Sequence, residues 1–100
     1  MIKHVVMWKL KDFAGGAAKA ENAQKIKEQL EGLKGKIKEV RSLEVGVNFN
    51  DSADSYDIVL YTEFATREDL KRYQNHPEHI KAGDFVIGLR LDRKVVDYQV

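Results

Sequence analysis

The strongest constraint on this chain lies near its N-terminus, where residues 2–10 are apolar on both faces of an extended segment. One parity of this segment consists of Ile2, His4, Val6, Trp8 and Leu10. The other parity includes Val5 and Met7, so a strand here has little polar surface to present to solvent. The segment is far shorter than the roughly 18–20 residues that a membrane-spanning helix needs. We therefore expect a strand that is covered on both sides.

Changes of periodicity along the chain predict the order strand, helix, strand, strand, helix, strand. After a loop over 12–16, a helix from about residue 17 carries an apolar stripe of Ala20, Ala23, Ile26, Leu30, Leu33 and Ile37. Further strands are predicted over 40–47, 56–64 and 94–100. A helix opens with a capping box at Thr66 and ends near His76, because Pro77 disfavours helical geometry at the preceding residue. Pro77 then begins a short helix.

This order predicts an α+β fold, a ferredoxin-like β-α-β-β-α-β protomer with a four-stranded antiparallel sheet and its helices on one face. The other face of the sheet would carry Val5, Met7, Val59 and Tyr61. An uncovered apolar face of this kind indicates a partner surface. We expect a homodimer formed by sheet-to-sheet packing, which gives a dimeric α/β barrel.

The composition excludes several classes of partner and site. Lys and Arg number 17 and Asp and Glu 16, a formal net charge of +1, so no nucleic acid or membrane partner is expected. Cysteine is absent, which excludes disulfides and thiolate sites. The glycines lack the spacing of a phosphate-binding loop, and no cofactor is expected. With no room for a signal peptide before the first strand, we expect a single cytoplasmic domain over residues 1–100.

Several segments together resemble one known family. They are Ile2 to Asp12, Val45-Gly46, Tyr56 to Leu60, Glu63-Phe64, Tyr73-Gln74-Asn75-His76-Pro77-Glu78-His79 and Val96-Asp97-Tyr98. The pattern is similar to the stress-responsive α/β-barrel (Dabb) domain family, and the Tyr-x-x-His-Pro-x-His segment is its most specific part. The resemblance implies a ferredoxin-like protomer that dimerises into a barrel. Most members of that family are known only as stress-induced or uncharacterised proteins.

One plant member, olivetolic acid cyclase, closes a linear polyketide by an intramolecular aldol condensation, and likeness to it implies site residues here. Its catalytic tyrosine falls on Tyr73, its catalytic histidine on His79 and its strand-one histidine on His4. A further histidine of the cyclase is replaced by Ile58, and its first-helix aromatics fall on small or aliphatic positions. These departures from the cyclase bear on the identity of the substrate more than on the polar centre.

The residues themselves are compatible with such chemistry. His79 lies in the first turn of a predicted helix, where the helix dipole favours a neutral imidazole that can remove a proton next to a carbonyl. Tyr73 can donate a hydrogen bond to the carbonyl oxygen as enolate charge develops. His4 shares its parity with Val6 and Trp8, so it is expected to face the helices and meet the other two. The predicted ligand is a small carbonyl or aromatic compound.

The same residues can also have purely structural roles. Tyr73 fits a core position, His4 and His79 fit buried hydrogen-bonded histidines, and His76 fits a helix cap. A metal site on His4, His76 and His79 is disfavoured, because Pro77 makes the rings of His76 and His79 diverge.

Three functions are compatible with the sequence. The first is an uncharacterised stress-responsive protein with a small-molecule pocket between sheet and helices. The second is a cofactor-independent cyclase or lyase that uses His79 and Tyr73 with His4. The third is a non-catalytic stability or interaction protein. A haem-degrading or quinol-oxidising site is a weaker fourth option, since Trp8 and Asn48 alone do not establish one.

Overall fold

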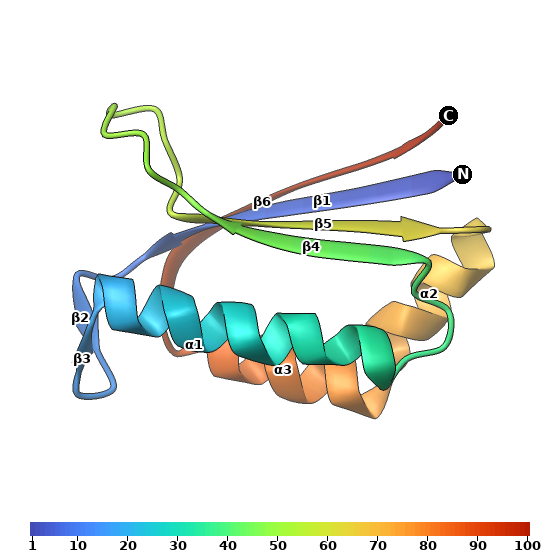
Figure 1. Cartoon of the computed structure of the whole chain (residues 1–100), viewed down its shortest axis with the longest axis horizontal. Helices are drawn as coiled ribbons and strands as arrows, with labels where there is room; N and C mark the ends of the chain where they lie inside the picture. Colours follow the sequence, from blue (N-terminus) through green and yellow to red (C-terminus); the bar gives the residue numbers. More distant parts are fainter.

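The chain folds into a four-stranded antiparallel sheet with helices packed on one of its faces (Figure 1). This computed structural model describes residues 1–100. The elements in chain order are β1 (Ile2–Leu10), β2 (Phe13–Ala14), β3 (Ala17–Ala18), α1 (Lys19–Glu31), the 3-10 helix η1 (Gly32–Gly35), β4 (Ser42–Val47), β5 (Ile58–Phe64), α2 (Arg67–Asn75), α3 (Pro77–Ile87) and β6 (Arg90–Gln99). The predicted ferredoxin-like α+β plan is confirmed.

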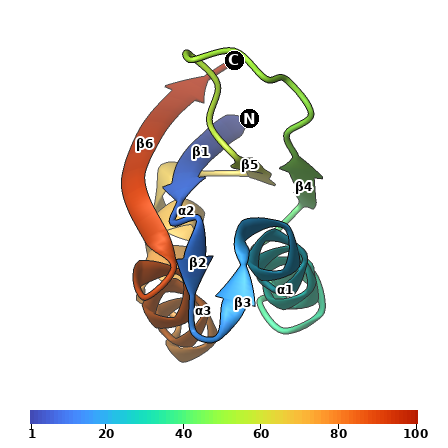
Figure 2. The same ribbon diagram turned by 90° about the vertical axis from the view of Figure 1, so that its left-hand side faces the viewer.

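The strand predicted at the N-terminus, β1, lies inside the sheet. The strand order is β4-β5-β1-β6, so β1 is hydrogen-bonded along both edges. Its register against β5 runs from Ile2 opposite Phe64 to Trp8 opposite Ile58. Figure 2 shows α1 and α3 side by side beneath the sheet. One face of β1 therefore packs against the helices, as the apolar residues at its even-numbered positions predict.

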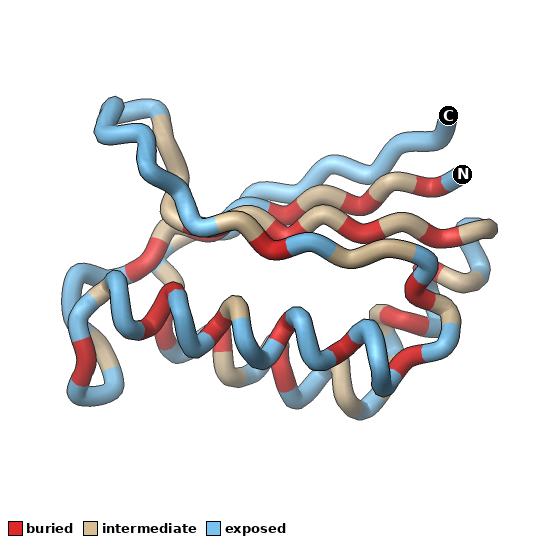
Figure 3. The backbone as a smooth tube through the Cα atoms, viewed as in Figure 1, coloured by how far each residue is buried: buried red, intermediate tan, exposed pale blue.

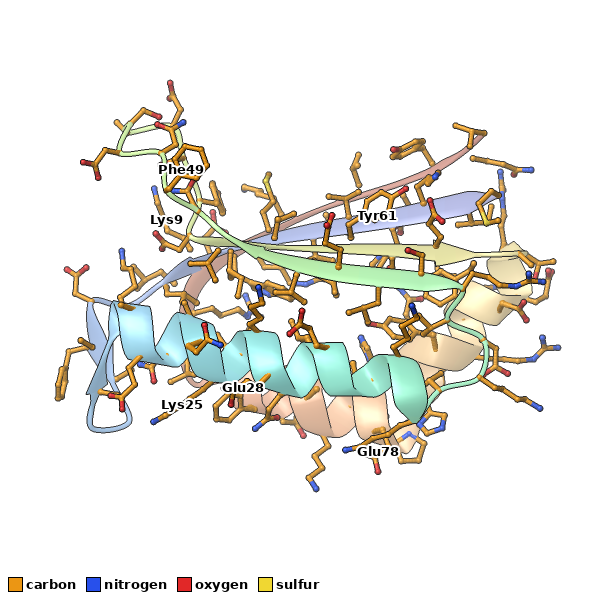
Figure 4. The ribbon with its side chains drawn as sticks, in the orientation of Figure 1. Lys9, Lys25, Glu28, Phe49, Tyr61 and Glu78 are labelled. Atoms are coloured by element: carbon orange, nitrogen blue, oxygen red, sulfur yellow. The ribbon has the colours of Figure 1, made fainter.

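The core lies between the sheet and the helices. Its members from β1 and β5 are Ile2, Val6, Trp8, Leu10, Ile58, Leu60 and Phe64, and those from α1 and α3 are Ala23, Ile26, Leu30, Ala82 and Val86. In Figure 3 buried segments alternate with less buried ones along the central strands and along the helices. Lys25, Glu28 and Glu78 point away from the sheet (Figure 4). The predicted stripe of α1 is confirmed at its buried positions Ala23, Ile26 and Leu30. Ala20, predicted on the same stripe, is exposed.

The corner between α2 and α3 follows from local sequence signals. The hydroxyl of Thr66 accepts a hydrogen bond from Asp69 N at 3.0 Å and caps α2. His76 is extended, with φ −67° and ψ 135°, and Pro77 is the first residue of α3. The Nδ1 atom of His76 accepts a hydrogen bond from Glu78 N at 3.1 Å. The predicted cap is confirmed, although α3, at 11 residues, is longer than the short helix expected.

Several boundaries differ from the sequence-based prediction. β4 begins at Ser42 instead of residue 40 and β5 at Ile58 instead of residue 56, and α1 ends at Glu31, before Leu33 and Ile37 of the predicted stripe. The loop at 12–16 contains a hairpin of β2 and β3, turned by Gly15 and Gly16 at φ 58° and 79°, and α1 begins only at Lys19. Positive φ at both turn positions favours glycine, so the Gly-Gly pair is the local signal for this hairpin. The last strand begins at Arg90 instead of Lys94. Its charged first residues lack alternation, and pairing with β1 extends it.

The face of the sheet away from the helices is apolar at its centre. Met7 is 39% exposed, Val96 57% and Tyr98 46%. Tyr61 stands on this side, and Phe49, which is fully exposed, lies on the loop between β4 and β5 (Figure 4). None of the helices combines the length and the apolar character that crossing a bilayer requires.

Candidate functional site

Three elements bring the predicted site residues together. Tyr73 comes from α2, His79 from α3 and His4 from β1. The ring centroid of Tyr73 lies 4.5 Å from that of His79 and 6.2 Å from that of His4. Tyr73 and His4 are fully buried, and His79 is partly buried. His4 therefore faces the helices, as its strand parity predicts, and its ring and that of His79 both lie near Tyr73.

The imidazole of His79 is held in a defined tautomer. Its Nδ1 atom lies 3.1 Å from the carbonyl oxygen of Gln74. A carbonyl can only accept, so Nδ1–H is the donor and Nε2 keeps its lone pair. Burial lowers the pKa of His79, with smaller contributions in the same direction from His4, Arg93 and His76, while the Gln74 carbonyl opposes the change. The neutral ring expected from the helix dipole thus has burial as its main cause.

His4 is paired with a carboxylate that sequence reasoning did not select. His4 lies directly opposite Asp97 in the pairing of β1 with β6. The Nδ1 atom of His4 is hydrogen-bonded to Oδ1 of Asp97. A carboxylate on Nδ1 fixes the orientation of the ring and makes Nε2 the free nitrogen. Asp97 could have been found only with the register of the last strand, because it is the cross-strand neighbour of His4.

The hydroxyl of Tyr73 is the one buried side-chain oxygen or nitrogen in the structure without a hydrogen-bond partner. Burial raises the pKa of Tyr73, so the group stays a phenol and a donor at neutral pH. Leaving a buried hydroxyl unsatisfied costs about 1–3 kcal/mol. The hydroxyl of Tyr73 therefore keeps an unused capacity to donate a hydrogen bond.

A cavity of about 120 Å³ opens beside these rings. It is lined by His4, Val6, Trp8, Leu30, Leu60, His79, Gly83, Val86, Ile87, Arg90 and Arg93. A single water needs only roughly 10–15 Å³ by this kind of measure, so the space suits a small molecule. Tyr73 lies against both imidazoles but is not part of this lining. The two histidines therefore face the cavity, with the tyrosine packed against them.

The other residues considered from sequence lie outside this centre. Nδ1 of His76 is occupied by the backbone of α3, so His76 acts as a cap. Ile58 is a core residue, 1% exposed. Asn48 hydrogen-bonds with Asn50 in its own loop, beside a separate depression of about 520 Å³, while Trp8 lines the histidine cavity. The structure does not bring Trp8 and Asn48 together.

Known proteins share this sequence pattern and fold. A family model described as Stress responsive A/B Barrel Domain matches residues 2–100. An uncharacterised protein of Streptomyces coelicolor is 33% identical over 79 residues, which are 79% of this chain and 79% of that protein. A dimeric ferredoxin-like protein of unknown function from Bacteroides fragilis has 36% identity and a TM-score of 0.85, covering 99% of this chain and 95% of that chain. A hydroxynitrile lyase from Passiflora edulis has 14% identity and a TM-score of 0.82, covering 99% and 92%.

Proposed function

The chain belongs to the stress-responsive A/B barrel domain family, and within that fold we propose that it is a cofactor-independent cyclase or lyase acting on a carbonyl compound. The observation that carries the proposal is the unpartnered, buried hydroxyl of Tyr73, packed against the rings of His79 and His4. The neutral imidazole of His79 with a free Nε2 supplies a base, the phenol of Tyr73 supplies an oxyanion partner, and His4, bound to a carboxylate, supplies a fixed polar group beside them.

The proposed reaction begins with proton removal from the carbon next to the substrate carbonyl by Nε2 of His79. The electron pair of the C–H bond forms the enolate, whose oxygen accepts a hydrogen bond from the hydroxyl of Tyr73. In the cyclase direction the enolate carbon attacks a second carbonyl, and the new alkoxide takes a proton from the imidazolium of His79. In the lyase direction the same steps run in reverse and break the carbon–carbon bond. His4, oriented by Asp97, holds the substrate beside His79.

The hydroxynitrile lyase with this fold adds limited support. At 14% identity it shares the fold alone, so it indicates that this architecture accommodates a lyase without naming a substrate for this chain. The substrate class follows instead from the side chains around the cavity.

Hydrogen–deuterium exchange into simple carbonyl compounds tests the proposed proton removal directly. Wild-type protein is incubated in D2O with acetophenone, acetylacetone and pyruvate, and loss of the proton signal next to each carbonyl is followed by ¹H NMR. General acid–base catalysis contributes about 10²–10⁴-fold, so we expect the His79→Gln variant to lose acceleration on that scale. Tyr73→Phe should also lose most of it.

His76→Asn is the matched control, because asparagine preserves the cap of α3 and His76 lies outside the centre. It should keep the wild-type exchange rate. Exchange by His79→Gln at the wild-type rate would remove His79 from the mechanism. No acceleration of any probe by the wild-type protein would refute the proposed activity.

We also propose that the chain functions as a homodimer formed by packing the helix-free faces of two sheets. Met7, Val96 and Tyr98 leave apolar surface exposed there, and the Bacteroides fragilis structure with this fold is dimeric. Sedimentation at micromolar concentration should give twice the chain mass; a monomer would refute this assembly.

A further inference from the structure

The edge strand β6 presents two arginines to the histidine cavity. Arg90 and Arg93 both line it, together with His4 and His79. Residues three apart on a regular strand point to opposite faces of a sheet. Their presence in one cavity therefore needs a local irregularity in the strand.

A β-bulge supplies that irregularity. Arg93 pairs with Trp8 in β1, whereas Arg90 pairs with Leu10, and the register shifts between Lys9 and Leu10. Leu91 is left without a partner and is 65% exposed. Because Trp8 and Leu10 lie on the same face of β1, the bulge turns both arginines toward the helices. Bulges re-aim side chains in this way beside functional sites.

Neither guanidinium is neutralised within the protein. Arg90 and Arg93 form no ion pair, and their side chains donate no hydrogen bond. No Asp or Glu lines the cavity. The nearest acids along β6 are engaged elsewhere, since Asp92 accepts from Tyr56 and Asp97 is bound to His4. Arg93 also lies close enough to His79 to lower its pKa. The cavity therefore has an uncompensated positive charge.

Resting on the proposed function, we propose that the natural substrate carries a carboxylate, held by Arg90 and Arg93, on an apolar or aromatic body. A planar guanidinium binds a carboxylate through two parallel hydrogen bonds, which fixes direction as well as distance. The apolar body packs against Val6, Trp8 and Leu60, which line the same cavity. A carboxylate bound at Arg93 also offsets the positive charge that lowers the pKa of His79, so substrate binding makes the His79 imidazole a stronger base.

Benzoate and its neutral analogue benzamide test this assignment by calorimetric titration of the intact protein. Benzoate should bind and benzamide should bind at least tenfold more weakly. A hydrogen bond to a charged group corresponds to about ten- to hundredfold in affinity, so Arg93→Gln and Arg90→Gln should each weaken benzoate binding on that scale. Arg41→Gln is the matched control, because it removes the same charge from the residue just before β4, at the opposite edge of the sheet. It should bind benzoate as the wild type does.

An NMR titration of the His79 ring provides a second readout. Benzoate should raise the pKa of His79 in the wild type and leave it unchanged in Arg93→Gln. Equal affinity for benzoate and benzamide, or unchanged binding in both arginine variants, would overturn the carboxylate assignment even if proton exchange is observed. Arginine-dependent benzoate binding without any proton exchange would support the anion site and refute the proposed reaction.

Discussion

Replacing Tyr73 by phenylalanine removes one buried oxygen atom that has no hydrogen-bond partner. The ring can stay in place against Phe64, whose centroid lies 5.0 Å away. The change relieves the desolvation cost of an unsatisfied hydroxyl, about 1–3 kcal/mol. The void left by one oxygen, roughly 10 Å³, costs only a few tenths of a kcal/mol by the volume dependence of cavity energies. We expect Tyr73→Phe to be more stable than the wild type by roughly 1–2 kcal/mol, while it loses proton-exchange activity.

Urea and thermal unfolding at equal protein concentration measure this effect. In a domain of this length 1 kcal/mol shifts Tm by about 4–8 °C, so the increase is readily resolved. Tyr61→Phe is the control, because the Tyr61 hydroxyl is hydrogen-bonded to Lys3 and Glu63 and its removal should not stabilise the protein. A Tyr73→Phe protein that is less stable than the wild type would mean that the hydroxyl has a partner in solution, and the argument for an open donor would fail.

Three further predictions concern other parts of the chain. The folded-state pKa of His79 lies below its ordinary value of 6.5, so the unfolded chain binds more protons below that pH and stability should fall as the pH drops below 6.5. His79→Gln should show a smaller fall in urea unfolding between pH 7 and 5, and an identical profile would contradict the burial argument. His76→Ala should lower the unfolding free energy by about 1 kcal/mol through loss of the α3 cap, and His76→Asn should restore it; equal stability of the two would count against the cap. Met7→Lys should give a monomer in sedimentation, and an intact dimer would place the interface elsewhere.

Much of the fold follows from local signals in the sequence. The two-sided apolar pattern of residues 2–10 predicts a strand that is covered on both faces, and the Thr66 and Pro77 signals predict the corner between α2 and α3. The start of β6 could not be predicted in this way. Three of its first four residues, from Arg90 to Arg93, are charged and the segment lacks alternation, so its strand structure depends on pairing with β1 through a bulge at Leu91.

Some residues of the candidate site could likewise be predicted from local sequence, whereas others depend on the pairing of distant strands. Tyr73 and His79 could be selected because the short segment that contains both resembles the family pattern. Asp97 and the arginines of β6 could not, because their place beside the cavity depends on the register between the first and last strands. The missing partner of the Tyr73 hydroxyl is a property of three-dimensional packing, which no local pattern encodes.

Because β6 lies at the edge of the sheet, the proposed carboxylate-binding residue Arg93 is separated from the buried residues of the proposed reaction. The proposed substrate-holding residue His4 and hydrogen-bond donor Tyr73 are buried in the interior, where substitution disturbs packing as well as chemistry. Arg93 lies on an exposed strand held by one neighbour, where a substitution usually changes stability by less than about 0.5 kcal/mol. A substitution of Arg93 can therefore change the proposed substrate preference without altering the buried residues His4 and Tyr73.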